Sequence, residues 1–304
     1  MLTAAAIRPS RTLNAAYDTC LRLARQHYEN FPVASRLVPV RMRPHIAAVY
    51  AFARAADDFA DEGSRSNTAR LALLDDWGRL LHDAAAGTTR DPDDGGEDST
   101  AKAIFLALGH TIRTCHLEVE LLDDLLSAFR QDVLIKRYDT WDELLDYCRR
   151  SANPIGRLVL RIAGYHDDRR DRWSDAVCTA LQLTNFWQDL ARDWQNGRVY
   201  VPQSLLRTSG AREEDLARRM ISAEWQSALR AAAAKTRELF ETGRPVADSV
   251  TGRLRWELRA TWLGGMRILD ALDRRAFDVF VARPTLDWRD AGAIVWHTMK
   301  WRAS

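Results

Sequence analysis

The repeat of apolar residues at three- and four-residue spacing most constrains what this 304-residue chain can fold into. Such a repeat places apolar side chains on one face of an α-helix, whereas a half-buried strand alternates every second residue. The segments with this helical period are 45–62, 71–86, 103–115, 117–135, 174–194, 223–241 and 253–272. Good strand candidates are absent. The sequence therefore predicts an all-α fold.

One polar segment, GTTRDPDDGGEDST at 87–100, interrupts this pattern. Its aspartates lack the ordered alternation ending in Glu that an EF-hand calcium loop requires, so we expect a flexible loop between helices. Residues 1–14 are expected to form a loose N-terminus. No internal repeat and no second compositional regime divides the chain, which predicts a single helical domain over residues 1–304.

The helix expected at 45–62 carries charge along its core-facing side. Residues three or four apart share a helix face, so one stripe contains Ile46, Tyr50, Arg54, Asp57 and Asp61. Charges that continue a core-facing stripe are costly unless they are paired, solvated in a cavity or bound to a metal. Asp57 and Asp61 are therefore candidate metal ligands.

The helix expected at 174–194 repeats this arrangement. Its polar stripe contains Cys178, Gln182, Asn185, Asp189 and Asp193. Asp189 and Asp193 would lie one turn apart, about 6 Å along the axis, a spacing that suits Mg²⁺ ions completed by water and phosphate oxygens. A single DxxxD pattern is usually a solvated face. Two such patterns, both collinear with inward stripes, favour a grip on a magnesium-bound diphosphate.

Composition and missing motifs exclude several other classes of function. A formal net charge of +2 gives no support for nucleic-acid binding. No GxGxxG, GxxxxGK[ST], HExxH or GxSxG pattern occurs, so nucleotide-loop, zinc-protease and serine-hydrolase chemistry are not indicated. Four scattered cysteines without a CxxC pair argue against a zinc site or a disulfide framework and indicate a reducing cytoplasm.

The chain shows no signal peptide and no apolar run near the ~20 residues that a membrane-spanning helix needs. We expect a cytoplasmic protein, at most peripheral on the inner face of the cell membrane. The segment 253–302 contains ten Lys and Arg against six Asp and Glu. A solvated helix face explains this excess most simply, and weak attraction to an anionic membrane is the alternative.

Two segments resemble the paired aspartate-rich signatures of the squalene/phytoene synthase family. They are RAADDFADE at 54–62 and QLTNFWQDLARDWQNGRVYVP at 182–202, and the resemblance extends from about residue 27 to the region near Arg283. It implies the all-helical isoprenoid synthase fold with a central cavity, three Mg²⁺ ions and prenyl diphosphate substrates. The eleven Trp would suit a pocket for long apolar chains or carbocations.

Residue by residue, the resemblance implies a metal site and a substrate site. The implied metal ligands and catalytic residues are Asp57, Asp61, Asp189 and Asp193. Tyr50 and Glu29 are further catalytic candidates. The implied substrate-binding residues are His27, Tyr28, Asn30, Arg54, Gln182, Asn185, Gln188, Arg198, Tyr200 and Arg283.

Within the family, four segments are similar to the branch that converts presqualene diphosphate to hydroxysqualene. They are 27–39, 50–63, 147–160 and 185–189. Reduction to squalene would then belong to a separate flavin-dependent enzyme. This branch implies two pathway partners, that reductase and a presqualene diphosphate synthase.

Two departures from the common family pattern bear on the substrate. Most members have NxxRD where this chain has Asn185 to Asp189 with neutral Gln188, which suits a substrate with one diphosphate rather than two. Most also have a Ser/Lys/Ser-type segment where this chain has residues 27–31. Tyr28, Glu29 and Asn30 either hold the water that captures the cation or only pack and cap the first helix.

Three other functions stay open at this point. The chain could be a presqualene diphosphate, phytoene or dehydrosqualene synthase that joins two prenyl diphosphates. It could be a non-catalytic prenyl-synthase-like scaffold, although a scaffold has no reason to keep four inward aspartates. A helical membrane-surface adaptor is disfavoured, because no segment shows a strongly basic amphipathic face.

Overall fold

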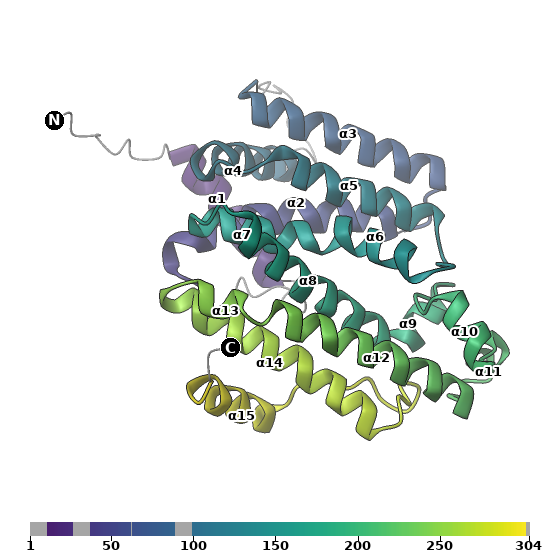
Figure 1. The fold of residues 1–304 in the computed structure, drawn as a ribbon. Coiled ribbons are helices and arrows are strands. Elements are labelled where there is room, and N and C mark those ends of the chain that lie inside the picture. The colour runs from purple at the N-terminus through teal and green to yellow at the C-terminus, as the bar shows by residue number, and fades with distance from the viewer. Residues whose placement is uncertain (1–10, 27–36, 62, 89–98, 302–304) are drawn as a thin grey trace. The chain divides into compact units, whose positions relative to one another are not determined.

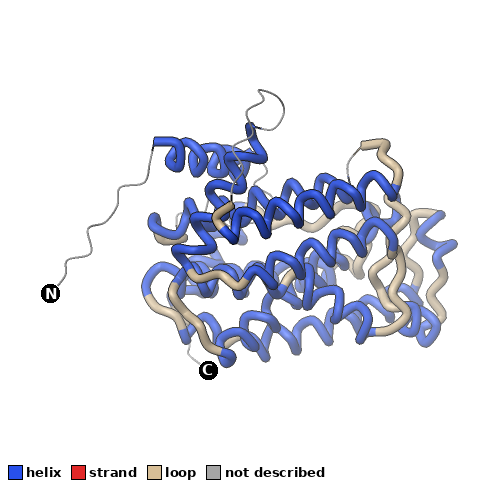
Figure 2. Tube along the Cα trace, turned by 90° about the horizontal axis from the view of Figure 1, so that it is seen from above, coloured by secondary structure: helices blue, strands red, loops and turns tan. Residues whose placement is uncertain are grey.

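The computed structural model describes residues 11–26, 37–61, 63–88 and 99–301. Throughout these ranges the chain consists of helices and loops, with one isolated parallel bridge between Arg137 and Val199 (Figures 1 and 2). The predicted all-α fold is confirmed. No helix in the described ranges combines the length and the apolar content needed to cross a membrane.

Contacts divide the chain into two compact units. Unit 1 comprises Met1–Arg130 with Arg161–Gly164, and unit 2 comprises Gln131–Leu160 with Tyr165–Ser304. The expected single domain over 1–304 stays a prediction, because the structure describes each unit by itself.

Unit 1 is a packed group of long helices. They are α1 (Arg11–Gln26), α2 (Arg43–Asp61), α3 (Asn67–Ala86), α4 (Ser99–Cys115) and most of α5 (Val119–Leu134), with a 3₁₀ turn η2 (Val40–Met42) before α2. Helix α1 packs on α2 and α4, and α3 packs on α4. The core is aromatic: the ring of Trp77 lies 4.5 Å from that of Phe105 and 6.1 Å from that of Phe52, centroid to centroid.

Two expected boundaries in unit 1 are corrected. Residues 11–14, expected in a loose N-terminus, begin α1, because Leu13 is buried and starts the inward stripe that continues through Ala16, Tyr17 and Cys20. Residues 99–100, expected in the loop, open α4. The rest of the expected loop falls between α3 and α4, and its residues 89–98 lie outside the described ranges.

Unit 2 is built around α8 (Asp168–Gln188). The other helices are α6 (Trp141–Ser151), α7 (Asn153–Ala163, to Leu160 in this unit), α9 (Leu190–Gln195), α10 (Gln203–Ser209), α11 (Glu213–Ala217), α12 (Ala223–Gly243), α13 (Val246–Ser249), α14 (Gly252–Arg274) and α15 (Trp288–Met299). Helix α8 packs against α6, α12, α13 and α14. Its approach to α12 is so close that a Cβ on Gly243 would lie 2.6 Å from the Trp173 carbonyl oxygen.

The single helix expected at 174–194 is divided into α8 and α9 at Asp189. Asp189 has φ −100° and ψ 8°, so it leaves the helical range and caps both helices. The turn nevertheless continues, because the Asp189 carbonyl oxygen accepts a hydrogen bond from the Asp193 amide at 2.8 Å. The two aspartates therefore keep their expected one-turn separation.

Candidate active site

The first aspartate pair lies at the C-terminal end of α2 in unit 1. Ile46 and Tyr50 are buried, Arg54 and Asp57 are half-buried, and Asp61 is exposed. The expected stripe thus passes from the core to the accessible surface. Burial raises the pKa of the Tyr50 hydroxyl, although nearby Arg54 opposes this shift. Tyr50 is therefore neutral at physiological pH.

Arg54 holds the carboxylates of this helix end. Its Nη1 lies 3.4 Å from Oδ2 of Asp57, and its Nη2 lies 2.6 Å from Oδ1 of Asp58. Arg54 is about one-third exposed, so it remains accessible to an anion. The arrangement puts one guanidinium and three carboxylates, including that of Asp61, within the last two turns of α2.

The second aspartate pair lies at the junction of α8 and α9 in unit 2. Between residues 174 and 189 the only partly accessible side chains form one stripe, namely Asp175, Cys178, Leu181, Gln182, Asn185 and Asp189. All other side chains in this stretch are buried. Within residues 174–189 the predicted polar stripe therefore lies on the accessible face of the helix, where a polar ligand could reach it.

Two successive side chains at this junction bond the segment after α14. The Gln188 side-chain amide donates to the Pro284 carbonyl oxygen, and Arg283 forms a bidentate ion pair with Asp189 through Nε and Nη2, the latter at 3.1 Å. Gln188 is only 6% exposed. The structure therefore brings Gln188, Asp189 and Arg283 together, and it shows Gln188 as a residue that positions the Arg283 segment.

The segment after α9 contains the predicted Arg198 and Tyr200 and folds back against that helix. Gly197, with φ +72°, turns the chain so that the Arg198 amide donates to the Asp193 carbonyl oxygen at 2.8 Å. The ring of Tyr200 stacks on that of Phe186 with centroids 3.8 Å apart and planes 7° apart. Arg198 and Tyr200 are thus fixed beside the second aspartate pair.

Sequence reasoning missed a buried polar group next to these residues. The Tyr147 hydroxyl donates to Oδ2 of Asp132 at 2.8 Å, and Nη2 of Arg198 approaches the Asp132 carbonyl oxygen at 3.4 Å. Burial raises the pKa of Tyr147 and Tyr200 far above the usual tyrosine value, and the Asp132 carboxylate adds to both shifts.

A sequence signal for Asp132 did exist. Asp132 continues the apolar stripe Leu121, Leu125 and Ala128 at helical spacing, and all four side chains are buried. The rule that singled out Asp57, a charge continuing an inward stripe, applies equally to Asp132.

Four of the predicted site residues, His27, Tyr28, Glu29 and Asn30, lie outside the described residues. Their expected roles stay predictions. The remaining predicted residues fall into two groups: Tyr50, Arg54, Asp57 and Asp61 lie together in unit 1, and the others lie in unit 2.

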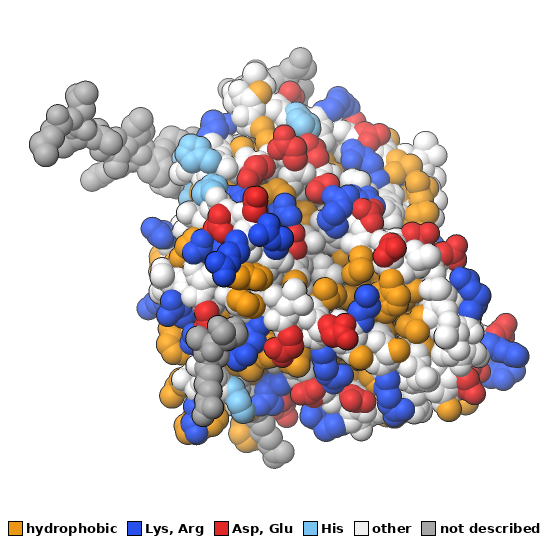
Figure 3. Space-filling model, in the orientation of Figure 1, with side chains coloured by type: hydrophobic (Ala, Val, Ile, Leu, Met, Phe, Trp, Pro, Cys, Tyr) orange, Lys and Arg blue, Asp and Glu red, His pale blue; other side chains and the backbone are white. Residues whose placement is uncertain are grey.

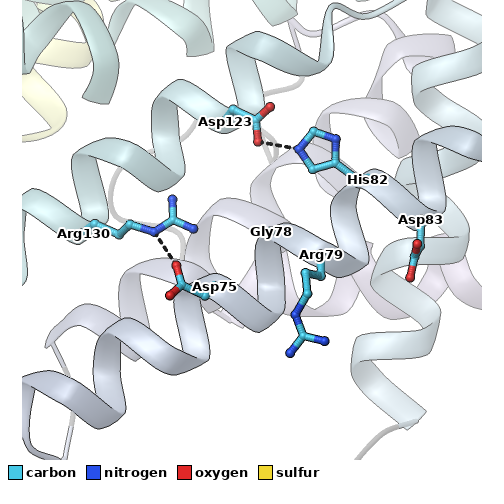
Figure 4. A pocket seen from close by; sticks show the side chains of 7 residues that line it. All are labelled: Asp75, Gly78, Arg79, His82, Asp83, Asp123 and Arg130. Atoms are coloured by element: carbon cyan, nitrogen blue, oxygen red, sulfur yellow. Dashed lines mark hydrogen bonds and ion pairs between the residues drawn. The ribbon is translucent and has the colours of Figure 1, made fainter.

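A shallow hollow in unit 1 lies between α3 and α5 and contains none of the predicted site residues (Figure 4). Two contacts cross it: Nε of Arg130 lies 2.9 Å from Asp75, and Nε2 of His82 lies 3.1 Å from Asp123. The hollow is therefore a polar surface region, and the aspartate pairs remain the candidate active site.

The aspartate pairs suit magnesium by the chemistry of their donors. All four candidates are carboxylates, the hard oxygen ligands that Mg²⁺ prefers, and Mg²⁺ needs only one or two of them beside water and phosphate oxygens. Over the described ranges no three His, Cys, Asp or Glu side chains form a closed metal-binding group.

Comparisons with known proteins agree on one family. The model of squalene/phytoene synthases matches residues 24–290. The chain belongs to the squalene/phytoene synthase family. Its members are prenyl synthases that typically depend on Mg²⁺.

Individual relatives differ in their similarity to this chain. A hydroxysqualene synthase from Zymomonas mobilis is 39% identical over 77% of this chain and 74% of the relative. A 15-cis-phytoene synthase from Synechococcus elongatus is 28% identical over 95% of each chain. The crystal structure of a squalene synthase from Alicyclobacillus acidocaldarius has a TM-score of 0.80 and 40% identity, covering 88% of this chain and 97% of that one.

Proposed function

We propose that this chain converts presqualene diphosphate to hydroxysqualene in a magnesium-dependent reaction within bacterial squalene and hopanoid biosynthesis. The choice of this reaction depends on the residue at position 188, which is Gln. It is neutral, it directly precedes the candidate metal ligand Asp189, and its amide is engaged by the Pro284 carbonyl oxygen. The greater similarity to a hydroxysqualene synthase than to a phytoene synthase supports the same choice.

The chain's own charges supply the grip on the diphosphate. In unit 1, Asp57 and Asp61 would hold Mg²⁺, and in unit 2, Asp189 and Asp193 would do the same. When bound, Mg²⁺ neutralises charge on a departing diphosphate. Arg54 and Arg283 are already paired with these aspartates, at Asp57 and Asp189. Each arginine can turn from its carboxylate to a phosphate oxygen, since guanidinium matches both bidentately.

The reaction balances without a redox cofactor. The C–O bond to the diphosphate breaks, and its electron pair leaves with the diphosphate. The cyclopropylcarbinyl cation rearranges, a water oxygen adds to it, and that oxygen loses one proton to give the alcohol. Tyr147 and Tyr200 stay neutral beside Arg198, because burial raises the pKa of both hydroxyls.

The deciding experiment incubates the purified chain and Mg²⁺ with presqualene diphosphate or with farnesyl diphosphate. Hydroxysqualene should form from the first substrate, and the second should stay unused. Rapid consumption of farnesyl diphosphate with presqualene diphosphate ignored would instead make the chain a synthase that joins two prenyl diphosphates. If diphosphate were released from neither substrate, the chain would be a non-catalytic scaffold.

A variant pair tests the role of the second aspartate pair. Asp189→Asn should lower the rate of diphosphate release at least about 100-fold, because a positioned charge group typically contributes two or more orders of magnitude. Asp270→Asn is the matched control, since Asp270 also pairs with an arginine, Arg237 at 3.1 Å, on the exposed side of α14. The control should keep the rate of the unchanged chain.

A further inference from the structure

Helix α15, at the lower left of Figure 1, carries its large apolar side chains outward. Trp288, Val295, Trp296 and Met299 are 79%, 60%, 52% and 63% exposed. Their spacings of seven, eight and eleven residues from Trp288 place them on one helix face. A surface helix normally turns such a stripe toward the core. In α15 this apolar stripe faces outward instead.

Contacts at both ends fix this orientation. Near the start of the helix, Asp290 accepts from Nη1 of Arg267 on α14 at 3.1 Å. Just after the helix, Nε1 of Trp301 donates to Asp248 at 3.2 Å, and its ring meets that of Trp262 at 5.3 Å. Asp290 thus turns toward α14, and the apolar stripe lies on a different side of the helix from Asp290.

Basic groups accompany the exposed aromatic rings. Nζ of Lys300, an exposed side chain, lies 4.1 Å from the centroid of the Trp296 ring. Figure 3 shows hydrophobic side chains interleaved with Lys and Arg at its lower left, where α15 lies. Tryptophan beside lysine or arginine is the combination enriched at the boundary between lipid headgroups and acyl chains.

We infer that α15 docks this chain on the surface of an anionic phospholipid bilayer, with the stripe of Trp288, Val295, Trp296 and Met299 entering the headgroup region. With 12 residues the helix is too short to cross the bilayer and would lie along it. The stripe exposes on the order of 500 Å² if large side chains present roughly 150–250 Å² each. A stable dimer buries about 800 Å² per partner, so a second copy is the poorer occupant.

The test uses the full-length chain and needs no substrate, so it is independent of the proposed reaction. The chain is floated with vesicles of phosphatidylcholine alone and with vesicles of equal parts phosphatidylcholine and phosphatidylglycerol. It should float with the anionic vesicles and lose this binding in high salt. The double variant Trp288→Ser with Trp296→Ser should bind at least about tenfold less, because two interfacial rings are removed.

Met220→Ser is the matched control, since Met220 is an exposed apolar residue of unit 2, at 45%, away from α15. It should float like the unchanged chain. Because both tryptophans are exposed, circular dichroism and melting temperature should be the same for all three proteins. A measurement without any substitution adds a second test: bromine-labelled phosphatidylglycerol should quench tryptophan fluorescence in the unchanged chain.

Three outcomes would overturn the inference. These are equal binding by the double variant, equal binding to both kinds of vesicle with no effect of salt, and absence of both flotation and quenching. A concentration-dependent dimer that only the double variant abolishes, in a chain that does not float, would assign the stripe to a second copy.

Discussion

At the level of single residues, Gln188 and Asp189 are neighbours in the chain and bond neighbouring residues of one segment, Pro284 and Arg283. The sequence predicted all but Pro284 of these as site residues. It could not show that they meet, because 94 residues separate Asp189 from Arg283 and no periodicity links positions that far apart. The local sequence pattern can predict that a residue belongs to a site, whereas the residue that it contacts there depends on tertiary packing.

Replacing Gln188 tests whether it positions the Arg283 segment. Gln188→Leu keeps the volume and removes the donor to the buried Pro284 carbonyl oxygen. An unsatisfied buried carbonyl costs about 1–3 kcal/mol, so the free energy of unfolding should fall by that amount. KM for the diphosphate substrate should rise more than kcat falls, because Arg283 loses its fixed position. Chemical denaturation and steady-state kinetics measure the two effects.

Gln195→Leu serves as the control for this variant, because Gln195 ends α9 and is exposed. It should leave both quantities unchanged. If Gln188→Leu lowered kcat alone, with KM and stability intact, Gln188 would act on the reacting substrate directly.

At the level of elements, periodicity located the long helices because each buries one continuous stripe. The predicted segment 223–241 corresponds to α12 (Ala223–Gly243), and 71–86 to α3 (Asn67–Ala86). Short helices such as α10 and α11 contain too few turns for a repeat to show. The break at Asp189 was missed for another reason: the apolar repeat continues through it, and only the backbone angles change.

A partly buried polar cluster joins α1, α2 and α4 in unit 1. The Tyr17 hydroxyl lies 3.2 Å from Nδ1 of His45, 2.8 Å from Nδ1 of His110 and 2.9 Å from Oγ1 of Thr111. Burial lowers the pKa of both histidines below the ordinary value of 6.5, and each feels a further positive neighbour, His110 for His45 and Arg113 for His110. The cluster is therefore built for neutral imidazoles.

This cluster predicts that unit 1 loses stability in mild acid. The folded-state pKa lies below the unfolded value, so the unfolded chain takes up protons first as pH falls. The stabilising contribution is complete above about pH 6.5 and declines as pH drops toward the lowered folded values. The free energy of unfolding, measured from pH 8 to pH 5, should therefore stay level at first and decrease once the pH is below about 6.5.

Substituting both histidines should weaken that dependence. His45→Gln with His110→Gln should start less stable at neutral pH and show a flatter decline in acid, because neither site can take up a proton. His297→Gln, at an exposed position on α15, should keep the slope of the unchanged chain. An undiminished slope in the double variant would assign the acid sensitivity to other groups.

At the level of the whole molecule, each unit contributes one aspartate pair and at least one arginine beside it. The sequence indicated both pairs because each continues an inward stripe on its own helix, a local property. The partner of Gln188 is not a local property, because the Pro284 carbonyl oxygen lies 96 residues away in the segment after α14. Local rules thus pointed to the candidate ligands and could not show the residues that contact them.

Binding of Mg²⁺ with inorganic pyrophosphate should stabilise the folded chain as a whole. A ligand that binds only the folded state at 100 times its Kd adds about 2.7 kcal/mol. For a chain of this size that corresponds to a rise in melting temperature of roughly 5 °C. Pyrophosphate without Mg²⁺ should give little shift, because the Asp189 and Asp193 carboxylates repel it, and EDTA should reverse the full shift.

The aspartate variants decide whether this stabilisation comes from the proposed site. Asp189→Asn with Asp193→Asn should lose most of the rise, because the ligands for the metal are gone while the one-turn backbone hydrogen bond between these residues is kept. Asp270→Asn with Asp273→Asn is the matched control, since both residues lie on α14 and pair with Arg237 of α12. The control should show the whole rise. An equal rise in both double variants would mean that Mg²⁺ and pyrophosphate bind elsewhere, and the second aspartate pair would then be a solvated helix end.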